Sequence, residues 1–240
     1  MSFQFIHMDG YARKPDKAGR SIEWILNEAD RVPIACIHIE TPKPPKLVYG
    51  CSISELRQLH DVAVSGTRVA WGKRDRAIPN TQKTLMTFVA SHPLRADEAV
   101  SDVAKMAEYE AWERDTIRWL KDRYGGEFKT AVRHEDEAHM HIHAYVLPIH
   151  LRATDLHPGA FAKRRAFREA IERGDDPKTS SKRGDEAYRA AMRELQSDYQ
   201  EKVGARHGLA RIGAGRRRLT RAQWQQEGSG AGVQEHLRTN

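Results

Sequence analysis

The sequence has few cysteines and no segment with the composition of a membrane span or a leader. Cys36 and Cys51 lack C-x-x-C spacing, which excludes a disulfide framework and a zinc knuckle and predicts buried free thiols in a reducing compartment. No apolar run approaches the ~20 residues of a membrane-spanning helix. Residues 1–14 lack the basic and then apolar regions of a signal peptide. We therefore expect a cytoplasmic protein without a membrane partner.

Positive charge is in excess. The 240 residues include 40 Lys and Arg against 33 Asp and Glu, which gives a net charge of +7 and a pI of about 9.5. This balance favours a polyanionic partner, most simply nucleic acid, over a basic soluble protein without one. Hydrophobic residues make up 39% of the chain, which is enough for a sizeable core.

Apolar periodicity predicts a mixture of strands and helices without strict βαβ alternation. We expect an α+β fold in which a central, mainly antiparallel sheet is flanked by helices and followed by a helical extension. The expected strands are 3–8, 34–40, 67–72, 83–91, 127–134 and 139–148, and residues 73–82 are expected to form a basic loop. The expected helices are 20–31 with Ser21 as N-cap, 52–65 with a Ser52–Glu55 capping box, 96–124, 159–173 and 184–206, with a linker over 174–185.

These patterns divide the chain into three parts. We expect a catalytic domain over 1–150, a helical extension over 151–210 and a basic flexible tail over 211–240.

The stretch RHEDEAHMHIHAYVLP, residues 133–148, crowds histidines and carboxylates at the turn of a predicted hairpin. His141 and His143 share one face of the second strand because side chains alternate along a strand, and His134 ends the first strand across the hairpin. Three imidazoles without thiolates are typical of a catalytic metal site with open positions. Mn²⁺ or Mg²⁺ would suit the nearby carboxylates, and imidazole also accepts Zn²⁺. A solvated, His-rich hairpin tip is the alternative, and His139 is expected outside the ligand set.

The pattern His134-x-Asp136-Glu137-x-x-x-His141-x-His143-x-x-x-x-Pro148 resembles the third motif of the HUH relaxases, most closely the MobV (Pre/Mob) plasmid mobilisation and recombination proteins. Those proteins commonly have H-x-D-E-x-x-P-H-x-H, and this chain has Met140 where the proline is usual. Residues 194–215 are similar to the segment after the family's catalytic domain, which often ends in GLxRG and here reads GLARIG.

The resemblance implies a metal-dependent endonuclease that nicks and rejoins single-stranded DNA at an origin of transfer. The three histidines would hold the ion on the scissile phosphate, and a nucleophile would stay joined to the 5′ phosphate. Other relaxosome proteins are further expected partners. A rolling-circle replication initiator of the same fold, a catalytically lapsed DNA-binding module and a hydrolase of small substrates are the alternatives, and the positive charge disfavours the last.

The nucleophile is not evident from the sequence. MobV proteins use a histidine in an RHNxR-like segment and other HUH relaxases use a tyrosine, whereas residues 21–31 of this chain contain neither. Tyr11 in a basic loop, His38 on a predicted strand and His7 at a strand end are the candidates. Glu137, which matches the family's motif glutamate, is expected to orient a ligand imidazole or accept a proton, and Asp136 is expected to cap the turn away from the ion.

Basic residues predict the contacts to DNA phosphates. The candidates are Arg13, Lys14, Lys73, Arg74, Arg76, Arg216, Arg217 and Arg218. Trp112 and Trp119 lie two turns apart on one predicted helix and are expected in the core.

Overall fold

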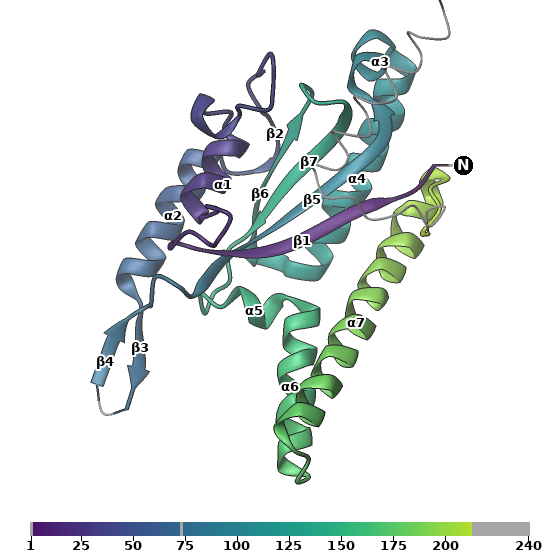
Figure 1. Ribbon diagram of the computed structural model, residues 1–240. Helices are drawn as coiled ribbons and strands as arrows, with labels where there is room; N and C mark the ends of the chain where they lie inside the picture. The colour runs from purple at the N-terminus through teal and green to yellow at the C-terminus, as the bar shows by residue number, and fades with distance from the viewer. Residues whose placement is uncertain (1, 73, 213–240) are drawn as a thin grey trace, which may run out of the picture.

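The computed structural model describes residues 2–72 and 74–212, and a five-stranded antiparallel sheet forms its centre (Figure 1). The strands are β1 (Phe5–Ala12), β2 (Lys46–Gly50), β5 (Lys83–Arg95), β6 (Phe128–His134) and β7 (His139–Val146). Their order is β1-β5-β7-β6-β2, and every neighbouring pair is antiparallel. The expected α+β class is confirmed, and β7 with its histidines is the central strand.

Helices cover the two faces of the sheet unequally. On one face, α4 (Val103–Tyr124) and the end of α7 (Pro177–Lys202) bury a large aromatic core that includes Trp112 and Trp119, as expected. On the other face, α1 (Ile22–Ala29) and α2 (Ile53–Gly66) bury a smaller core. Alternation along β7 sends Met140 and Ile142 into the first core and Tyr145 into the second. The histidines are on the α1 face.

The expected helix starts are confirmed at two serines. The Ser21 hydroxyl accepts the N–H of Trp24, and Ser52 and Glu55 form the reciprocal capping box of α2. The predicted helix 96–124 is instead two helices, α3 (Ala96–Ser101) and α4. Asp102 separates them because its extended backbone breaks the first helix and its carboxylate caps the second, accepting the N–H groups of Ala104 and Lys105.

Three sequence-based assignments around residues 33–77 are wrong. Residues 34–40 form turns after the short 3₁₀ helix η1 (Pro33–Ala35), because Ala35, Cys36 and Ile39 pack as a small separate cluster. The expected loop 73–82 contains β4 (Arg74–Ala77), which pairs with β3 (Arg68–Trp71) in a two-stranded ribbon. Strand β2 was not predicted, because it is a short edge strand without buried residues.

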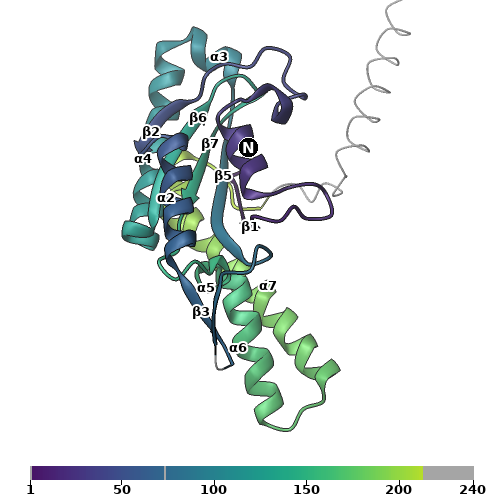
Figure 2. The same cartoon turned by 90° about the vertical axis from the view of Figure 1, so that its left-hand side faces the viewer.

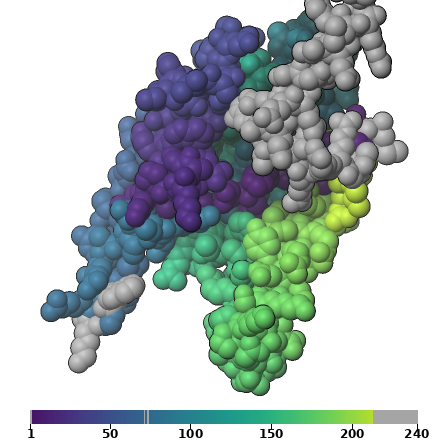
Figure 3. All heavy atoms as spheres, in the orientation of Figure 1, coloured from purple at the N-terminus to yellow at the C-terminus, as the bar shows by residue number. Residues whose placement is uncertain are grey.

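The expected linker 174–185 is also wrong, because α7 begins at Pro177 with Asp176 as its N-cap. Helices α5 (Ala153–Leu156) and α6 (Pro158–Glu172) precede it, and α6 and α7 form a hairpin that projects from the sheet, as does the β3–β4 ribbon (Figures 2 and 3). Gly184 allows close packing, since an added Cβ would lie 3.1 Å from the Lys163 carbonyl oxygen. The domain boundaries stay a prediction, and the proposed tail lies outside the described residues from 213 onward.

The end of α7 returns to the sheet. Leu195 and Tyr199 are buried in the aromatic core, and the Gln196 side-chain amide donates to the Ile6 carbonyl of β1. The short 3₁₀ helices η2 (Gly125–Glu127) and η3 (Gly204–His207) complete the secondary structure of the described part. None of the helices in this part combines the length and hydrophobicity of a membrane span. Both cysteines are free thiols; Cys36 is buried and Cys51 is half-buried.

Candidate metal centre

Three histidine rings meet at the end of the β6–β7 hairpin. His134 lies opposite His141 in the strand register, and His143 lies opposite Val132. The ring centroids are 4.7 to 5.3 Å apart, and one nitrogen from each ring lies within 4.8 Å of the others. His134 and His141 are buried while His143 is partly exposed, so the cluster opens to solvent on one side only.

Backbone carbonyls fix the tautomers of two of these rings. Nε2 of His134 is 2.9 Å from the Ala29 carbonyl oxygen at the end of α1, and Nδ1 of His141 is 2.9 Å from the His139 carbonyl oxygen. A carbonyl can only accept, so both of these nitrogens carry protons. The lone pairs are therefore on Nδ1 of His134 and Nε2 of His141. Nδ1 of His134 is buried and has no partner among the described residues, which is the state expected of a metal ligand.

The surroundings keep two of the three rings, His134 and His143, uncharged. Burial, followed by the positive charge of Arg31, lowers the pKa of His134 to about 4. Burial, followed by its two histidine neighbours, lowers the pKa of His143 well below its ordinary value. Both rings are neutral at pH 7, and only a neutral imidazole offers its lone pair to a metal ion. The residues present therefore fit a divalent cation.

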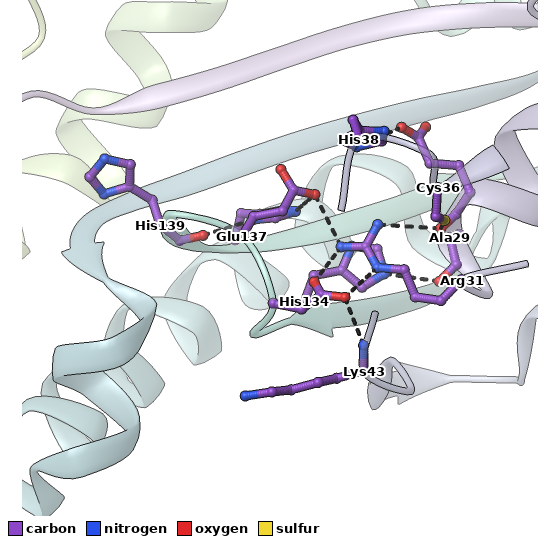
Figure 4. A network of polar contacts seen from close by, with 11 residues as sticks. Ala29, Arg31, Cys36, His38, Lys43, His134, Glu137 and His139 are labelled. Atoms are coloured by element: carbon purple, nitrogen blue, oxygen red, sulfur yellow. Dashed lines mark hydrogen bonds and ion pairs between the residues drawn. The ribbon is translucent and has the colours of Figure 1, made fainter. Parts of the chain in front are cut away.

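Arg31, two residues after the end of α1, binds the carboxylates of the hairpin turn. Arg31 binds Asp136 through two hydrogen bonds of 2.6 and 2.9 Å, and it also donates to Glu137 at 3.0 Å (Figure 4). Arg31 is buried and has a left-handed backbone with φ of 59°, which is uncommon for a residue with a side chain. Sequence reasoning missed Arg31, because it is 105 residues from Asp136 and nothing local marks it.

The two carboxylates have different environments. Burial alone would raise the pKa of Asp136, but the hydrogen bonds from Arg31 and from the Lys43 N–H, together with the Arg31 charge, outweigh it and lower that pKa. Asp136 thus joins the hairpin to α1 and to the loop at Lys43, rather than capping the turn as expected. Glu137 is partly exposed, and its Oε1 lies 3.5 Å from Nε2 of His141. Glu137 is therefore the carboxylate beside a ligand nitrogen.

The candidate nucleophiles lie in three different places. The strand register aligns His7 with Val89 and Val89 with His143, so His7 is two strands from the cluster in the same row. Tyr11 lies four residues further along β1, about 13 Å at the usual rise. Burial and then the charge of Asp9 raise the pKa of Tyr11 to about 12, which opposes formation of a phenolate.

His38 is on a turn and not on the expected strand. Its Nε2 lies 4.0 Å from a carboxylate oxygen of Glu28 on α1. Glu28 belongs to the same polar network as the cluster, since its carbonyl accepts from Arg31 and Ala29 next to it accepts from His134 (Figure 4).

The candidate DNA contacts are separated. Arg74 and Arg76 are exposed on the β3–β4 ribbon. Lys14 lines a surface hollow of about 430 Å³ beside Tyr11, whereas the guanidinium of the exposed Arg13 donates to the Ile78 carbonyl. Lys73, Arg216, Arg217 and Arg218 lie outside the described residues.

Solved structures of a relaxase domain are similar in fold to this chain. No family model matches the sequence, and neither does any curated protein sequence. One of these solved structures is a Mn-bound crystal structure of the MobM relaxase domain (MOBV; Mob_Pre) bound to a 23-nucleotide plasmid pMV158 oriT DNA. Its TM-score with this chain is 0.54 and the sequence identity is 15%, and the match covers 95% of this chain and 99% of the MobM chain. A second Mn-bound MobM structure with oriT DNA has a TM-score of 0.54 and a sequence identity of 14%, and the match covers 94% of this chain and 99% of the MobM chain. The chain therefore has the relaxase-like fold of the MobM domain.

Proposed function

We propose that this chain is a metal-dependent relaxase, an endonuclease that nicks and rejoins single-stranded DNA at the origin of transfer of a plasmid or other mobile element. The observation that carries the proposal is the cluster of His134, His141 and His143, with fixed tautomers and an unpartnered buried Nδ1. The likeness in fold to MobM, whose domain binds oriT DNA and Mn, supports it.

Each residue of the site has a role in this proposal. The three histidines would hold one divalent ion, Mn²⁺ or Mg²⁺ with Zn²⁺ as the alternative. Such an ion, when bound, polarises a phosphoryl oxygen and orients the scissile phosphate. Glu137 would accept a proton from the nucleophile, and Arg31 fixes its carboxylate for this role. The other expected role, orientation of the His141 ring, belongs to the His139 carbonyl, because that carbonyl accepts from Nδ1 and the nitrogen beside Glu137 carries the lone pair.

We place His38 ahead of Tyr11 as the nucleophile. The Glu28 carboxylate beside His38 can take the proton from one ring nitrogen while the other attacks phosphorus. The bond from phosphorus to the 3′ oxygen then breaks, the 3′ oxygen takes up a proton, and the 5′ phosphate remains on the protein. Tyr11 is less suited, because of its high pKa and its distance along β1. His7 is the third candidate because of its row in the sheet.

The test is to incubate the chain with Mn²⁺ and end-labelled single-stranded DNA drawn from a library of origin sequences, and to isolate a covalent adduct. Mass spectrometry of the digested adduct identifies the modified residue. His141→Ala is expected to abolish both adduct formation and Mn²⁺ binding measured by calorimetry. His150→Ala is the matched control, because His150 is exposed and lies outside the cluster.

The outcomes separate the candidates. A modified His38 supports the assignment, whereas a modified Tyr11 or His7 overturns it while leaving the relaxase proposal intact. Unchanged Mn²⁺ affinity in His141→Ala would contradict the metal site. Metal and DNA binding without any adduct would favour a DNA-binding module that has lost its catalytic activity.

A further inference from the structure

Two aromatic side chains near the N-terminus are exposed in the part of the chain that the structure describes. Phe5 is 51% exposed and Phe3 is 37% exposed. Together with Ser91, Pro93 and His139 they line a hollow of about 440 Å³ on the surface. Large exposed rings that surround one hollow are typical of a binding site rather than of an ordinary protein surface.

The hollow adjoins the histidine cluster. In the strand register, Phe5 lies opposite Ser91, Ser91 opposite His141, and His141 opposite His134. These four residues form one row across β1, β5, β7 and β6. Phe5 is thus two strands from His141, about 10 Å at the usual strand spacing. A phosphate at the histidines and a group held by Phe5 would therefore lie within the reach of one or two nucleotides of the same strand.

The lining combines apolar rings with polar atoms beside them. The Phe3 and Phe5 rings provide apolar area, and the Ser91 side chain lies beside them. Nδ1 of His139 donates to the Pro93 carbonyl oxygen at 3.1 Å, so its Nε2 is left as an acceptor. An unpaired nucleobase has the matching form, since its faces stack on aromatic rings and its edge carries donors and acceptors.

We propose that this hollow binds an unstacked base of the DNA strand whose phosphate lies at the histidines. The proposal rests on the proposed function. An apolar peptide or a second copy of this chain would also cover exposed phenylalanines, but the row shared with the histidines and the positive charge of the chain favour a nucleotide.

Binding of fluorescent single-stranded DNA, measured by anisotropy with Mn²⁺ present, tests the proposal. The oligonucleotides carry a single abasic site that is moved one position at a time. For the parent chain, one abasic position is expected to weaken binding about 5- to 150-fold, the usual effect of losing one stacked base. Phe5→Ala is expected to weaken binding of the intact strand by a similar factor and to be insensitive to the abasic site at that position.

Three further variants serve as references. Phe5→Trp should retain affinity, because indole also stacks, whereas Phe5→Leu should not. Phe161→Ala is the matched control, since Phe161 is an equally exposed phenylalanine on the α6–α7 hairpin. Mn²⁺ affinity and melting temperature verify that each variant is folded.

The results distinguish this proposal from the one on which it rests. If the parent binds the strand and forms the adduct but Phe5→Ala behaves like the parent, only the base-binding hollow is refuted. It is also refuted if Phe5→Ala responds to every abasic position as the parent does, or if Phe5→Ala changes only self-association. If the parent binds no single-stranded DNA, both proposals fall.

Discussion

At the scale of single residues, the site depends on which atom of each side chain is already used. One ring nitrogen of His134 and one of His141 donate to backbone carbonyls. The other nitrogen of each ring can therefore bind the ion that the cluster would share. The Asp136 carboxylate accepts hydrogen bonds from Arg31 and from the Lys43 N–H, whereas Glu137 is partly exposed beside His141. Asp136 is therefore held within the fold by its partners, and the proposed chemical role falls to Glu137.

Substitution of the three turn carboxylates should separate these roles. Under saturating Mn²⁺, Glu137→Gln is expected to slow nicking at least about 100-fold, the lower end of what a positioned general base contributes. Asp136→Asn should lower the free energy of unfolding by about 2 kcal/mol, because it replaces the buried two-bond pair with Arg31 and leaves Arg31 the partly exposed carboxylate of Glu137. Glu135→Gln should change neither the nicking rate nor the free energy of unfolding, because its partner Arg133 retains ion pairs with Glu110 and Glu113. Nicking rates and urea melts measure these effects, and a fast Glu137→Gln with normally stable Asp136→Asn contradicts the assignment.

His92 should make the fold sensitive to acid. It is buried against Tyr109 and Trp112, and burial lowers its pKa to about 4. In the unfolded chain it takes up a proton below about pH 6.5, but in the folded chain only near pH 4, so protons favour unfolding in that window. From pH 7 to 4.5 the parent should lose about 2 kcal/mol more stability than His92→Gln. Urea melts at both pH values measure the loss, with His150→Gln as control; equal losses would show that His92 does not contribute.

At the scale of elements, the sequence predicted the helices and strands that have strong local signals, such as strand alternation and helix caps, but not the pairing of strands that are far apart in the chain. The β6–β7 hairpin and the capping serines of α1 and α2 were predicted because alternation and caps are local signals. The row that joins Phe5 to His141 could not be predicted, because it depends on how strands far apart in sequence pair. The strand predicted at 34–40 failed because a short apolar run does not distinguish a strand from a packed turn.

The histidine cluster was predictable from the sequence, whereas the residues that orient it were not, and the difference lies in their separation along the chain. Its members come from one hairpin, so strand periodicity alone brings them together. Ala29 and Arg31, which fix the tautomer of His134 and the carboxylates, come from the end of α1 more than 100 residues earlier. Only the packing of α1 on the sheet brings them to the site.

The β3–β4 ribbon should contact DNA without stabilising the fold. It projects from the body, and Arg74 and Arg76 are exposed on one of its strands (Figure 3). Arg74→Gln with Arg76→Gln is expected to weaken DNA binding and to reduce the slope of log affinity against log salt by about 1, at ~0.7 per phosphate contact. The melting temperature should not change. Arg114→Gln with Lys121→Gln is the control, because these cations lie on α4 across the sheet from the histidines. Equal effects of both pairs would mean that only net charge matters.

At the scale of the whole molecule, the two faces of the sheet divide stability from chemistry. The face under α4 and α7 carries the aromatic core, with Trp112, Tyr109 and Tyr199 fully buried. The other face is covered in part by α1 and α2, and it also holds the buried rings of His134 and His141 and the exposed rings of Phe3 and Phe5. DNA is therefore expected along one face, and cations should contribute to its binding according to the face on which they lie.

The arginines at 216–218 provide the broadest test of that expectation. Residues 213–240 contain five arginines and two glutamates, a net +3 of the chain's +7. If these arginines contact the strand, replacing Arg216, Arg217 and Arg218 with Gln should reduce the salt slope by about 2, at ~0.7 for each lost contact to a single strand. Mn²⁺ affinity should not change, because His134, His141 and His143 are untouched.

The matched control replaces Arg114, Arg118 and Lys121 on α4, which removes the same charge from the face opposite the histidines. Affinity for one oligonucleotide, measured from about 50 to 200 mM salt, gives both slopes. A smaller slope in the 216–218 variant alone supports contact at those arginines. The same decrease in both variants would instead mean that the charge acts at long range, so that binding follows the net charge of the molecule and not its distribution.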